Sequence, residues 1–484
     1  MKLFFINWSG KDTGMIDVVR MLKRKHDIAY MTCLHIASEV DAREFPGTIL
    51  HEHEDALLGI PPKGFPRNIP PADSGLLRKL SETEVLTLTM MNKHFERKTV
   101  SERVFLYHTY VAYWDMILQE HHPDVIIFPT IPHSVYDFVI YALAVHCGIR
   151  TVMMEPTWIG DRMIIMNDYI TGPDFLRKEK APLPESSREK LAPDIQNEYE
   201  RHMRKGFDAT PVFVKNIKRN YSGVRLLYKK CRSFFSAVLV RRDFSTLLRV
   251  FMLPFRMLEP NLKKEYENVT LLPDFNKPFV YFPLHYQPER SSSPQGDVFV
   301  DQIYMAQVLA TSLPDGWSLY IKEHPTQWLY RGTRFFSYRF SGYYKALASI
   351  PRVCVVPLET STYTLTGHAK AVATMTGTAG FEAIVRRRPV LAFGYPWYRG
   401  APGVFDVRDN ASCRKALATI DSGFSTSEEE VQRYLCELDT FSFHGYIDRD
   451  GQTVSALSAQ ENAQILAREI STLLSRPVTN SSRA

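Results

Sequence analysis

The sequence predicts an α/β protein with two lobes and a long basic segment between them. Short apolar runs alternate with amphipathic stretches twice along the chain, first within residues 1–155 and again from residue 278 onward. This alternation is typical of parallel strands that are joined by crossover helices. A chain of 484 residues is also too long for one ordinary hydrophobic core, so two or more domains are expected.

The first alternation begins at the N-terminus. Residues 2–8 (KLFFINW) predict a buried strand, and the amphipathic stretch TGMIDVVRMLKRKH predicts a helix with Asp12 or Thr13 as its N-cap. Residues 28–36 predict a second strand, and 46–75, rich in proline and glycine, predict a long loop. A helical region is expected from there to about residue 121.

A strand–helix–strand unit follows. Its parts are PDVIIFPT (123–130), the helical stretch SVYDFVIYALAVHCG and IRTVMME (149–155). This pattern is typical of the parallel sheet of a Rossmann-like domain.

The second alternation has the same design. The expected elements are strand 278–284, helix FVDQIYMAQVLATSL, strand WSLYIKE, a helix near 341–349, strands VCVVP and KAVATMT, helix GFEAIVRR, strand PVLAFG and a final helix at about 459–475. The predicted fold is therefore α/β, with two Rossmann-like lobes around a helical basic insertion. The expected domains are 1–200, 201–270, 271–460 and 461–484.

Charge is concentrated between the two predicted lobes. Residues 201–265 contain 16 Lys and Arg against 4 Asp and Glu, although the whole chain carries a net charge of only +6. Phe, Leu and Tyr are interleaved with the basic residues, which favours a pair of interfacial helices on an anionic membrane surface. The alternative is an ordinary solvated face of two amphipathic helices.

The cysteines and the apolar runs predict where in the cell the protein is found, and they predict no metal site. The six cysteines are scattered without a CxxC or zinc spacing, so reduced thiols of a cytoplasmic protein are expected. The N-terminus does not have the pattern of a signal peptide. The longest apolar runs, such as SFFSAVLV, are far shorter than the ~20 residues of a membrane span. At most, peripheral contact with the inner membrane is expected.

A glycine-bearing turn, TGTAG (376–380), stands between a predicted strand and a helix. Backbone N–H groups at a helix N-terminus, with the hydroxyls of Thr376 and Thr378, can face a phosphate, and Gly377 and Gly380 allow close approach. An ordinary tight turn would have the same composition. Glu382, in the first turn of this helix, either caps the helix or accepts hydrogen bonds from ribose hydroxyls.

Two further motifs end strands of the C-terminal lobe. In KEHP (322–325), Lys322 and His324 alternate with Glu323 and are expected on one face of the strand, where they can converge on a phosphate. In HYQPERS (285–291), Glu289 is a candidate nucleophile or base, with His285 and Arg290 to neutralise charge. The alternative for KEHP is an ordinary solvated strand end. The alternative for HYQPERS is a surface ion pair between Glu289 and Arg290.

Candidates in the N-terminal lobe are carboxylates and one polar turn. Glu155 directly follows a strand and is a candidate base for an acceptor hydroxyl, unless it pairs with Arg162 or Arg150. Asp161 follows shortly after. The turn Ser9-Gly10-Lys11-Asp12 is expected to line the acceptor side, with Gly10 and Lys11 in contact with substrate. His133 and Asp137 are weaker candidates that can also cap their helix.

The order QPERS, KEHP, GTAGFEA and PVLAFGYPWY resembles the bacterial capsule polysaccharide synthesis proteins, which include GT-B-type Kdo transferases that use CMP-Kdo. The resemblance covers about 270–410 well, the N-terminal half in layout only and 201–265 hardly at all. It implies that Lys322, His324, Thr376, Thr378 and Gly380 hold the nucleotide phosphate and that Glu382 binds the ribose.

Two departures from the family pattern stand out. The family's catalytic aspartate of an Asp-Ala-Ser turn corresponds here to Glu289 of Glu-Arg-Ser. The family's frequent Tyr-x-Gly-Trp-Gly run is replaced by Tyr398-Arg399-Gly400-Ala401-Pro402.

The predicted function is a metal-independent glycosyltransferase of surface-polysaccharide synthesis, with no cofactor. Its partners would be a nucleotide sugar and a glycan or lipid-linked acceptor, and its lobes would be the acceptor side and the nucleotide-sugar side. Alternatives are a nucleotide-sugar epimerase or a polyol-phosphate polymerase. A non-enzymatic anion-binding protein would leave the ordered motifs unexplained, and nucleic acid is not expected because no RNA-binding signature is present.

Overall fold

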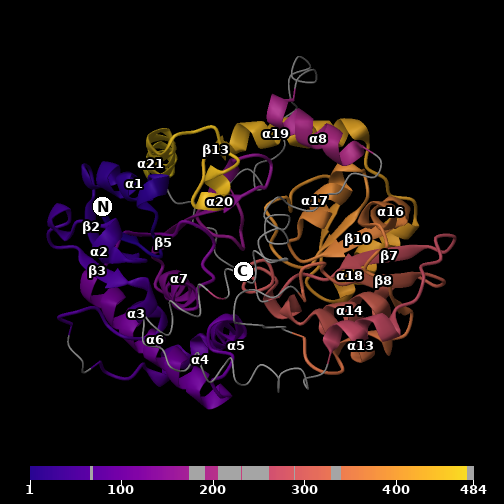
Figure 1. Ribbon diagram of the computed structural model, residues 1–484, viewed down its shortest axis with the longest axis horizontal. Coiled ribbons are helices and arrows are strands. Elements are labelled where there is room, and N and C mark those ends of the chain that lie inside the picture. Colours follow the sequence, from indigo (N-terminus) through magenta and orange to yellow (C-terminus); the bar gives the residue numbers. More distant parts are fainter. Residues whose placement is uncertain are drawn as a thin grey trace.

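The computed structural model describes residues 1–65, 69–173, 191–204, 231, 261–287, 289–328 and 339–476. These residues form two lobes, each built on its own sheet (Figure 1). The helical basic insertion and the membrane contact predicted for it fall almost entirely on 205–230 and 232–260, outside the described residues.

The N-terminal lobe has a seven-stranded sheet of order β13-β6-β5-β4-β1-β2-β3. Strands β1 to β5 are parallel, whereas β6 and β13 are antiparallel to their neighbours. The strands are β1 Lys2–Phe5, β2 Asp27–Cys33, β3 Ile49–Glu52, β4 Val125–Ile127, β5 Arg150–Pro156, β6 Arg162–Met166 and β13 Phe443–His444. The main helices of this lobe are α1 Met15–Lys23, α5 Ser81–Met90, α6 Val100–His121 and α7 Tyr136–His146.

The C-terminal lobe has a six-stranded, fully parallel sheet of order β12-β11-β10-β7-β8-β9. Its strands are β7 Phe279–Pro283, β8 Ser318–Lys322, β9 Val353–Val355, β10 Ala371–Thr374, β11 Val390–Ala392 and β12 Val404–Asp406. Its helices are α13 Leu262–Val269, α14 Gln302–Ser312, α15 Tyr343–Ala348, α16 Thr362–His368, α17 Thr378–Val385 and α18 Asn410–Asp421. Short strands with several buried residues, such as FVYFP of β7, suit a sheet that is covered on both faces.

Both sheets have the strand order of a doubly wound α/β fold, which confirms the predicted pair of Rossmann-like lobes. The order reverses between β1 and β4 in one lobe and between β7 and β10 in the other. Ligands of such sheets bind at the carboxyl ends of the strands beside this reversal. The topology therefore directs attention to the loops that follow β1, β4, β7 and β10.

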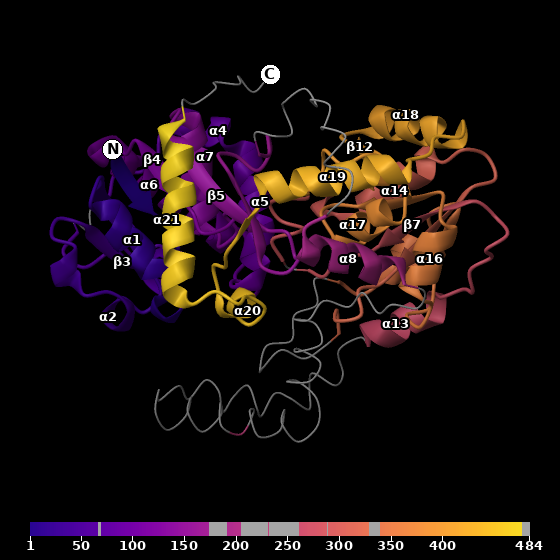
Figure 2. The same ribbon diagram turned by 90° about the horizontal axis from the view of Figure 1, so that it is seen from above.

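The chain returns to the N-terminal lobe at its end, so the predicted C-terminal lobe of 271–460 is too long. Helix α19 (Glu428–Phe441) leads back from the C-terminal lobe, β13 joins β6, and α21 (Ala459–Ser475) packs against α1 (Figure 2). The guanidinium of Arg150 donates to the carbonyls of Leu473, Leu474 and Arg476 at the C-terminal end of α21. Strand β13 has only two residues, too few to give a sequence signal.

Two local predictions are wrong. The stretch 46–75, predicted as a loop, contains β3 and helix α3 (His53–Leu57), because β3 gains its hydrogen bonds from the tertiary pairing with β2. The N-cap of α1 is Gly14, with φ 78°, and not Asp12 or Thr13. The Thr13 hydroxyl instead donates to the Gly10 carbonyl, and Asp12 pairs with Arg449.

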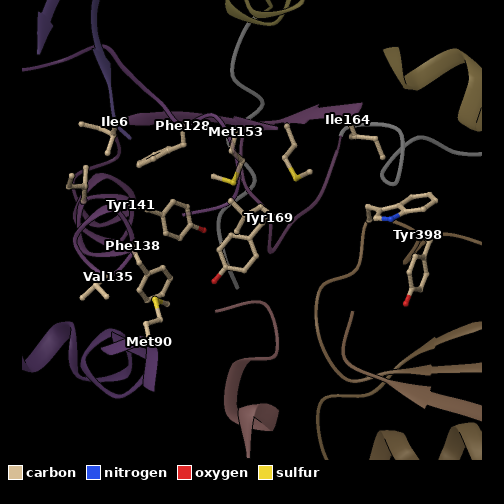
Figure 3. Close-up of a cluster of buried hydrophobic side chains, with 14 of the residues drawn as sticks. Ile6, Met90, Phe128, Val135, Phe138, Tyr141, Met153, Ile164, Tyr169 and Tyr398 are labelled. Atoms are coloured by element: carbon tan, nitrogen blue, oxygen red, sulfur yellow. The ribbon is translucent and has the colours of Figure 1, made fainter. Parts of the chain in front are cut away.

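The lobes share hydrophobic contacts as well as a cleft. One continuous cluster of buried side chains includes Tyr141, Met153 and Ile164 of the N-terminal lobe and Phe381 and Tyr398 of the C-terminal lobe (Figure 3). Within the described ranges, no helix is long and apolar enough to cross a membrane. All six cysteines are free thiols.

Candidate functional site

A cavity of about 340 Å³ lies between the two lobes, and residues of both lobes line it. Its volume lies within the range of small-ligand sites. The C-terminal lobe contributes the turn after β10, the start of α17 and the loop after β7; the N-terminal lobe contributes the end of β5 and the turn that follows. Helix α8 (Pro193–Met203) and the returning segment 445–454 close the remaining sides.

The glycine-bearing turn forms the floor of the cavity on the C-terminal side. Thr376 and Thr378 line the cavity, and helix α17 begins after Gly377 without a side-chain cap. The Thr376 hydroxyl donates to the Ser291 carbonyl at 2.8 Å, and the Tyr398 hydroxyl donates to the Gly377 carbonyl at 2.5 Å. The turn is therefore held from two sides, while the N-terminus of α17 faces the cavity.

The two glycines of this turn have packing roles. A Cβ on Gly380 would lie 2.3 Å from the hydroxyl oxygen of Tyr398, so the bare backbone makes room for this ring. A Cβ on Gly377 would lie 3.1 Å from Cε1 of His285. Both glycines therefore make room for protein side chains, and the close approach of a phosphate stays a prediction.

Glu382 places an unsatisfied carboxylate oxygen on the same wall. The residue is 5% exposed, and its Oε2 accepts no hydrogen bond from any described residue. Glu382 forms an ion pair with Arg386, whose Nη1 lies 3.8 Å from Oε2. Burial raises the pKa of the Glu382 carboxyl to about 7. A buried acceptor of this kind suits a ligand that donates hydroxyl hydrogen bonds.

Glu155 faces this wall from the N-terminal lobe, at the end of β5. Its Oε1 accepts a hydrogen bond from Nε2 of Gln295 at 3.1 Å and lies 3.9 Å from Nη2 of Arg290. Burial raises the pKa of the Glu155 carboxyl, while the Arg290 charge and the Gln295 hydrogen bond act against this rise. Arg290 also donates to the hydroxyl of Thr130 after β4, so the loop after β7 connects the two lobes.

The two alternatives for Glu155 are wrong. Arg162 is 3% exposed and pairs with Asp194 and Asp439, and Arg150 binds the end of α21. Asp161 lines the cavity, and its carboxylate accepts from Ser455 and lies 2.6 Å from Nδ1 of His444.

His285 does not supply the positive charge that its motif suggested. Its Nε2 accepts a hydrogen bond from the N–H of Met375 at 3.1 Å and lies 2.9 Å from the hydroxyl of Thr374. Burial lowers the pKa of the His285 imidazole to about 3, so the ring is neutral near pH 7. His285 instead links the loop after β7 to the turn after β10.

Glu289 lies outside the cavity that holds Glu155. Its Oε2 lies 3.8 Å from Nζ of Lys93, in a small pocket that Thr89 and His133 also line. Arg290, the next residue, borders both pockets. Glu289 therefore lines only the smaller pocket, and Arg290 pairs with Glu155 of the larger cavity rather than with Glu289.

Lys322 and His324 also lie away from the cavity. Lys322 Nζ donates to the Thr360 carbonyl at 2.5 Å and to the Thr362 hydroxyl at 3.2 Å. His324 Nδ1 lies 2.7 Å from the hydroxyl of Thr326. Strand β8 ends at Lys322, so the strand alternation that predicted one shared face does not extend to His324.

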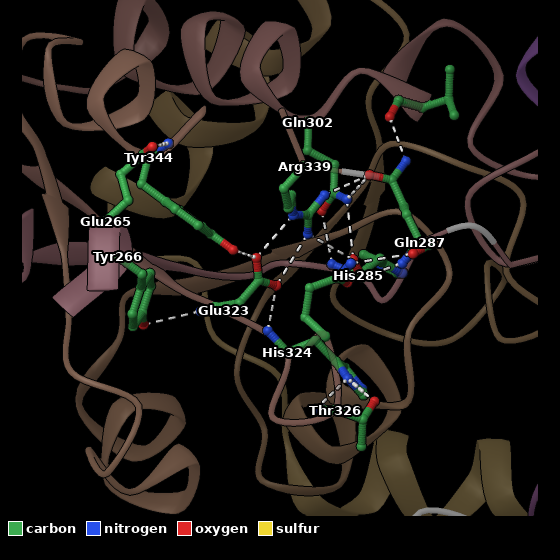
Figure 4. A network of polar contacts seen from close by, with 12 residues as sticks. Glu265, Tyr266, His285, Gln287, Gln302, Glu323, His324, Thr326, Arg339 and Tyr344 are labelled. Carbon is green, nitrogen blue, oxygen red and sulfur yellow. Dashed lines mark hydrogen bonds and ion pairs between the residues drawn. The ribbon is translucent and has the colours of Figure 1, made fainter. Parts of the chain in front are cut away.

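A buried ion pair beneath this motif was missed by the sequence interpretation. Glu323 and Arg339 have side chains that are 0% exposed, and Nε of Arg339 lies 2.8 Å from Oε2 of Glu323 (Figure 4). Arg339 also donates to Oε1 of Gln287 and to the carbonyl of His285. The guanidinium thus joins the loops after β7 and β8. The charge of Glu323 within KEHP was visible in the sequence, but no local pattern indicated its distant partner Arg339.

The remaining N-terminal candidates have structural contacts. The N–H groups of Gly10 and Lys11 both donate to Oε2 of Glu39, at 3.0 and 2.5 Å, and neither residue lines the cavity. Asp137 accepts from the N–H of Ser134 at 2.6 Å, and burial raises the pKa of its carboxyl to about 6. His133 Nδ1 lies 2.8 Å from the Ile131 carbonyl, and burial lowers the pKa of this imidazole to about 3.

Comparison with known proteins gives one family match. Residues 278–424 match the family described as capsule polysaccharide biosynthesis protein. This confirms, for that part of the chain, the resemblance predicted from the motifs of the C-terminal lobe. No curated protein matches the chain. Among the described residues, no group of three or more His, Cys, Asp or Glu is placed to hold a metal ion.

Several solved structures are similar at low identity. KpsC of Thermosulfurimonas dismutans, a beta Kdo 2,7 transferase, is 11% identical with a TM-score of 0.29, over 79% of this chain and 96% of that chain. The UDP-GlcNAc 2-epimerase of Methanocaldococcus jannaschii is 11% identical with a TM-score of 0.24, over 91% and 100%. The spinosyn rhamnosyltransferase SpnG is 13% identical with a TM-score of 0.25, over 92% and 97%. The fold assignment therefore rests on the two sheet orders rather than on these superpositions.

Proposed function

We propose that this protein transfers a sugar from a nucleotide donor to a glycan or lipid-linked acceptor of a capsule or lipopolysaccharide chain. One observation carries the proposal. A single cavity brings Thr376, Thr378 and Glu382 of the C-terminal lobe together with Glu155 and Arg290 at the lobe interface. Phosphate-binding, ribose-binding and proton-accepting groups are thereby available in one place.

The donor is proposed to lie on the C-terminal wall. The uncapped N-terminus of α17 and the hydroxyl of Thr378 suit a phosphate, and the unsatisfied oxygen of Glu382 suits ribose hydroxyls. The family resemblance also supports Lys322 and His324 as phosphate ligands. For that role Lys322, which does not line the cavity, has to release Thr360 and Thr362 and turn toward the donor.

Glu155 is proposed as the base. The acceptor hydroxyl oxygen attacks the anomeric carbon, the bond from that carbon to the nucleotide phosphate oxygen breaks, and the hydroxyl proton passes to Glu155. Arg290, beside Glu155, stabilises the negative charge that develops on the leaving phosphate. A fixed guanidinium and a helix N-terminus supply this stabilisation without a divalent cation, which is why we propose a metal-independent reaction.

For the donor we propose CMP-Kdo, on the basis of the family resemblance. The test is thermal stabilisation by CMP, CDP, UDP, GDP and ADP, because a ligand that binds the folded state raises the melting temperature. We expect CMP to stabilise the wild type and to lose this effect in Glu382→Gln and Thr378→Val. Glu359→Gln, an exposed carboxylate of the same lobe, is the matched control.

The same panel separates the possible outcomes. Loss of stabilisation in Lys322→Ala and His324→Ala would support the phosphate role of these residues. Stronger stabilisation by UDP, GDP or CDP would leave the proposed transferase activity in place and would change the proposed class of donor. If none of the nucleotides raised the melting temperature of a folded protein, this result would contradict a nucleotide site.

Membrane contact through the basic segment remains a proposal, since the segment lies outside the described residues. Sedimentation with anionic vesicles at physiological salt, compared with neutral vesicles and with RNA, tests it. The proposal fails if the protein stays in the supernatant with both kinds of vesicle.

A further inference from the structure

The cavity has a second end that a donor on the C-terminal wall leaves unused. This end is formed by the turn between β5 and β6, residues 157–161, and by the returning segment 445–454. The two stretches are far apart in sequence and meet because β13 pairs with β6. We call this end the acceptor end, and Trp158, Asp448 and Asp450 are among the residues that line it.

Trp158 is held at the cavity wall without being part of the core. It is 47% exposed, and its backbone lies in the left-handed region with φ 65°. The turn is fixed on both sides. The Thr157 hydroxyl accepts from the N–H of Ile159 and donates to the Arg162 carbonyl, and Ile159 is 1% exposed. A large indole in an uncommon backbone conformation beside a cavity is typical of a binding residue.

Carboxylates lie at the same end. Asp448 and Asp450 are exposed, and Asp448 Oδ1 also accepts from the N–H of Gly451 at 2.8 Å. Neither carboxylate forms an ion pair with a described residue. Carboxylate oxygens accept hydrogen bonds from hydroxyl groups and repel phosphates. The acceptor end is therefore suited to a neutral ligand with many hydroxyls, and poorly suited to the anionic part of a nucleotide.

A saccharide ring has both an apolar face for the indole and hydroxyl groups for the carboxylates. Its C–H groups form an apolar face that can lie on an indole, and its edge presents hydroxyls to carboxylates. We propose that Trp158, with Asp448 and Asp450, forms a binding subsite for a neutral sugar ring of the acceptor. Glu155 precedes this turn on the same strand and lines the same cavity, so an acceptor bound there can bring a hydroxyl to it. This inference rests on the proposed function and deepens it.

The test is saturation-transfer NMR on the full-length protein. The probes are the methyl glycosides of glucose, galactose and N-acetylglucosamine, with CMP and UDP measured in the same samples. We expect ring-proton signals from at least one glycoside with the wild type. In Trp158→Ala the affinity should fall about tenfold, the effect of one stacking contact of roughly 1.4 kcal/mol. Trp158→Phe should keep most of it, and Asp450→Asn should weaken it less than Trp158→Ala.

Phe105→Ala is the matched control, because Phe105 is an exposed aromatic residue of α6, 73% exposed, that does not line the cavity. Equal glycoside binding by this variant and the wild type would show that the loss in Trp158→Ala comes from the cavity and not from the removal of any exposed aromatic side chain. Unaltered nucleotide signals in Trp158→Ala would separate this subsite from the donor site.

Three results would overturn the inference. These are no glycoside signal with a folded wild type, unchanged glycoside binding in Trp158→Ala, or loss of the nucleotide rather than the glycoside signal in this variant, which would make the indole a platform for the nucleobase. If glycosides bind and no nucleotide does, the proposed donor site fails while the saccharide site stands.

Discussion

Each lobe has a glycine-bearing turn after a parallel strand near the centre of its sheet, and the two turns differ in what occupies them. After β1, the N–H groups of Gly10 and Lys11 are bound by the carboxylate of Glu39. After β10, helix α17 begins without a side-chain cap at the wall of a cavity. The same topology thus gives one turn whose N–H groups bind a carboxylate of the protein and one that borders the cavity between the lobes. The strand order determines where each turn lies. Whether the turn can bind an anion depends on a further segment, here the one that carries Glu39.

The largest expected effect concerns which lobe supplies the base. Glu155→Gln should lower the rate of sugar transfer by roughly 10²- to 10⁴-fold, the usual contribution of a general base, while nucleotide stabilisation stays unchanged. Glu289→Gln should stay within a few-fold of wild type, since Glu289 lies in a different pocket. Transfer assays on both variants check this. A large loss of rate in Glu289→Gln with little loss in Glu155→Gln would indicate that Glu289, in the loop after β7, is the base.

The next effect concerns the loops of the C-terminal lobe. Arg339→Met leaves the buried carboxylate of Glu323 without its cation, which should cost about 3–5 kcal/mol of unfolding free energy. Urea denaturation measures this cost. Arg43→Met is the control, because Arg43 forms an exposed pair with Asp41 and should leave the midpoint unchanged. A small loss in Arg339→Met would mean that the network is not held as described.

A pH-dependent effect is expected at Glu382. Its pKa is raised from 4.5 to about 7, so the folded state binds more protons than the unfolded state between these values. The unfolding free energy therefore falls as pH rises from 4.5 to 7, by an amount on the order of 3 kcal/mol. Glu382→Gln should remove this fall and be more stable than wild type above pH 7. Identical pH profiles of melting temperature for the two proteins would contradict the raised pKa of the buried Glu382 carboxyl.

The smallest effect tests the occupied turn of the N-terminal lobe. Glu39→Ala removes the acceptor of the Gly10 and Lys11 N–H groups, at a cost of about 1 kcal/mol, and leaves the turn open to an anion. Inorganic phosphate should then stabilise the variant more than the wild type in a thermal-shift assay. Glu44→Ala, a nearby exposed carboxylate, is the control. Equal responses to phosphate would mean that this turn does not bind anions even when it is empty.

The elements that were predicted correctly are those with a strong local pattern. The final helix was placed at 459–475, the observed bounds of α21, since an apolar face of period 3.6 follows a Ser458–Glu461 capping box. Strands β7 to β11 of the C-terminal sheet were found for a similar reason, because buried parallel strands are short continuous apolar runs, whereas the edge strand β12 was missed. The elements that were missed, such as β3 and β13, are short and obtain their hydrogen bonds from distant strands.

The same distinction holds for the site. The turn 376–380 and Glu382 were recognised from a local motif, and both Thr376 and Glu382 line the cavity. The charge state of His285 was not recognised, because a histidine in a polar motif gives no measure of its burial. Trp158 was not singled out, since its exposure at a cavity wall depends on the returning segment 445–454.

By itself, the sequence determined the two lobes, the strands and helices with a strong local pattern, and the turn that begins α17. These features follow from interactions between residues that are close along the chain, where periodicity and capping act. Only the tertiary structure decided that Glu155 meets Arg290 and Gln295, that Glu323 is paired with Arg339, and that segment 445–454 completes the cavity. Burial and charge pairing arise between segments that only folding brings together, so no local pattern encodes them.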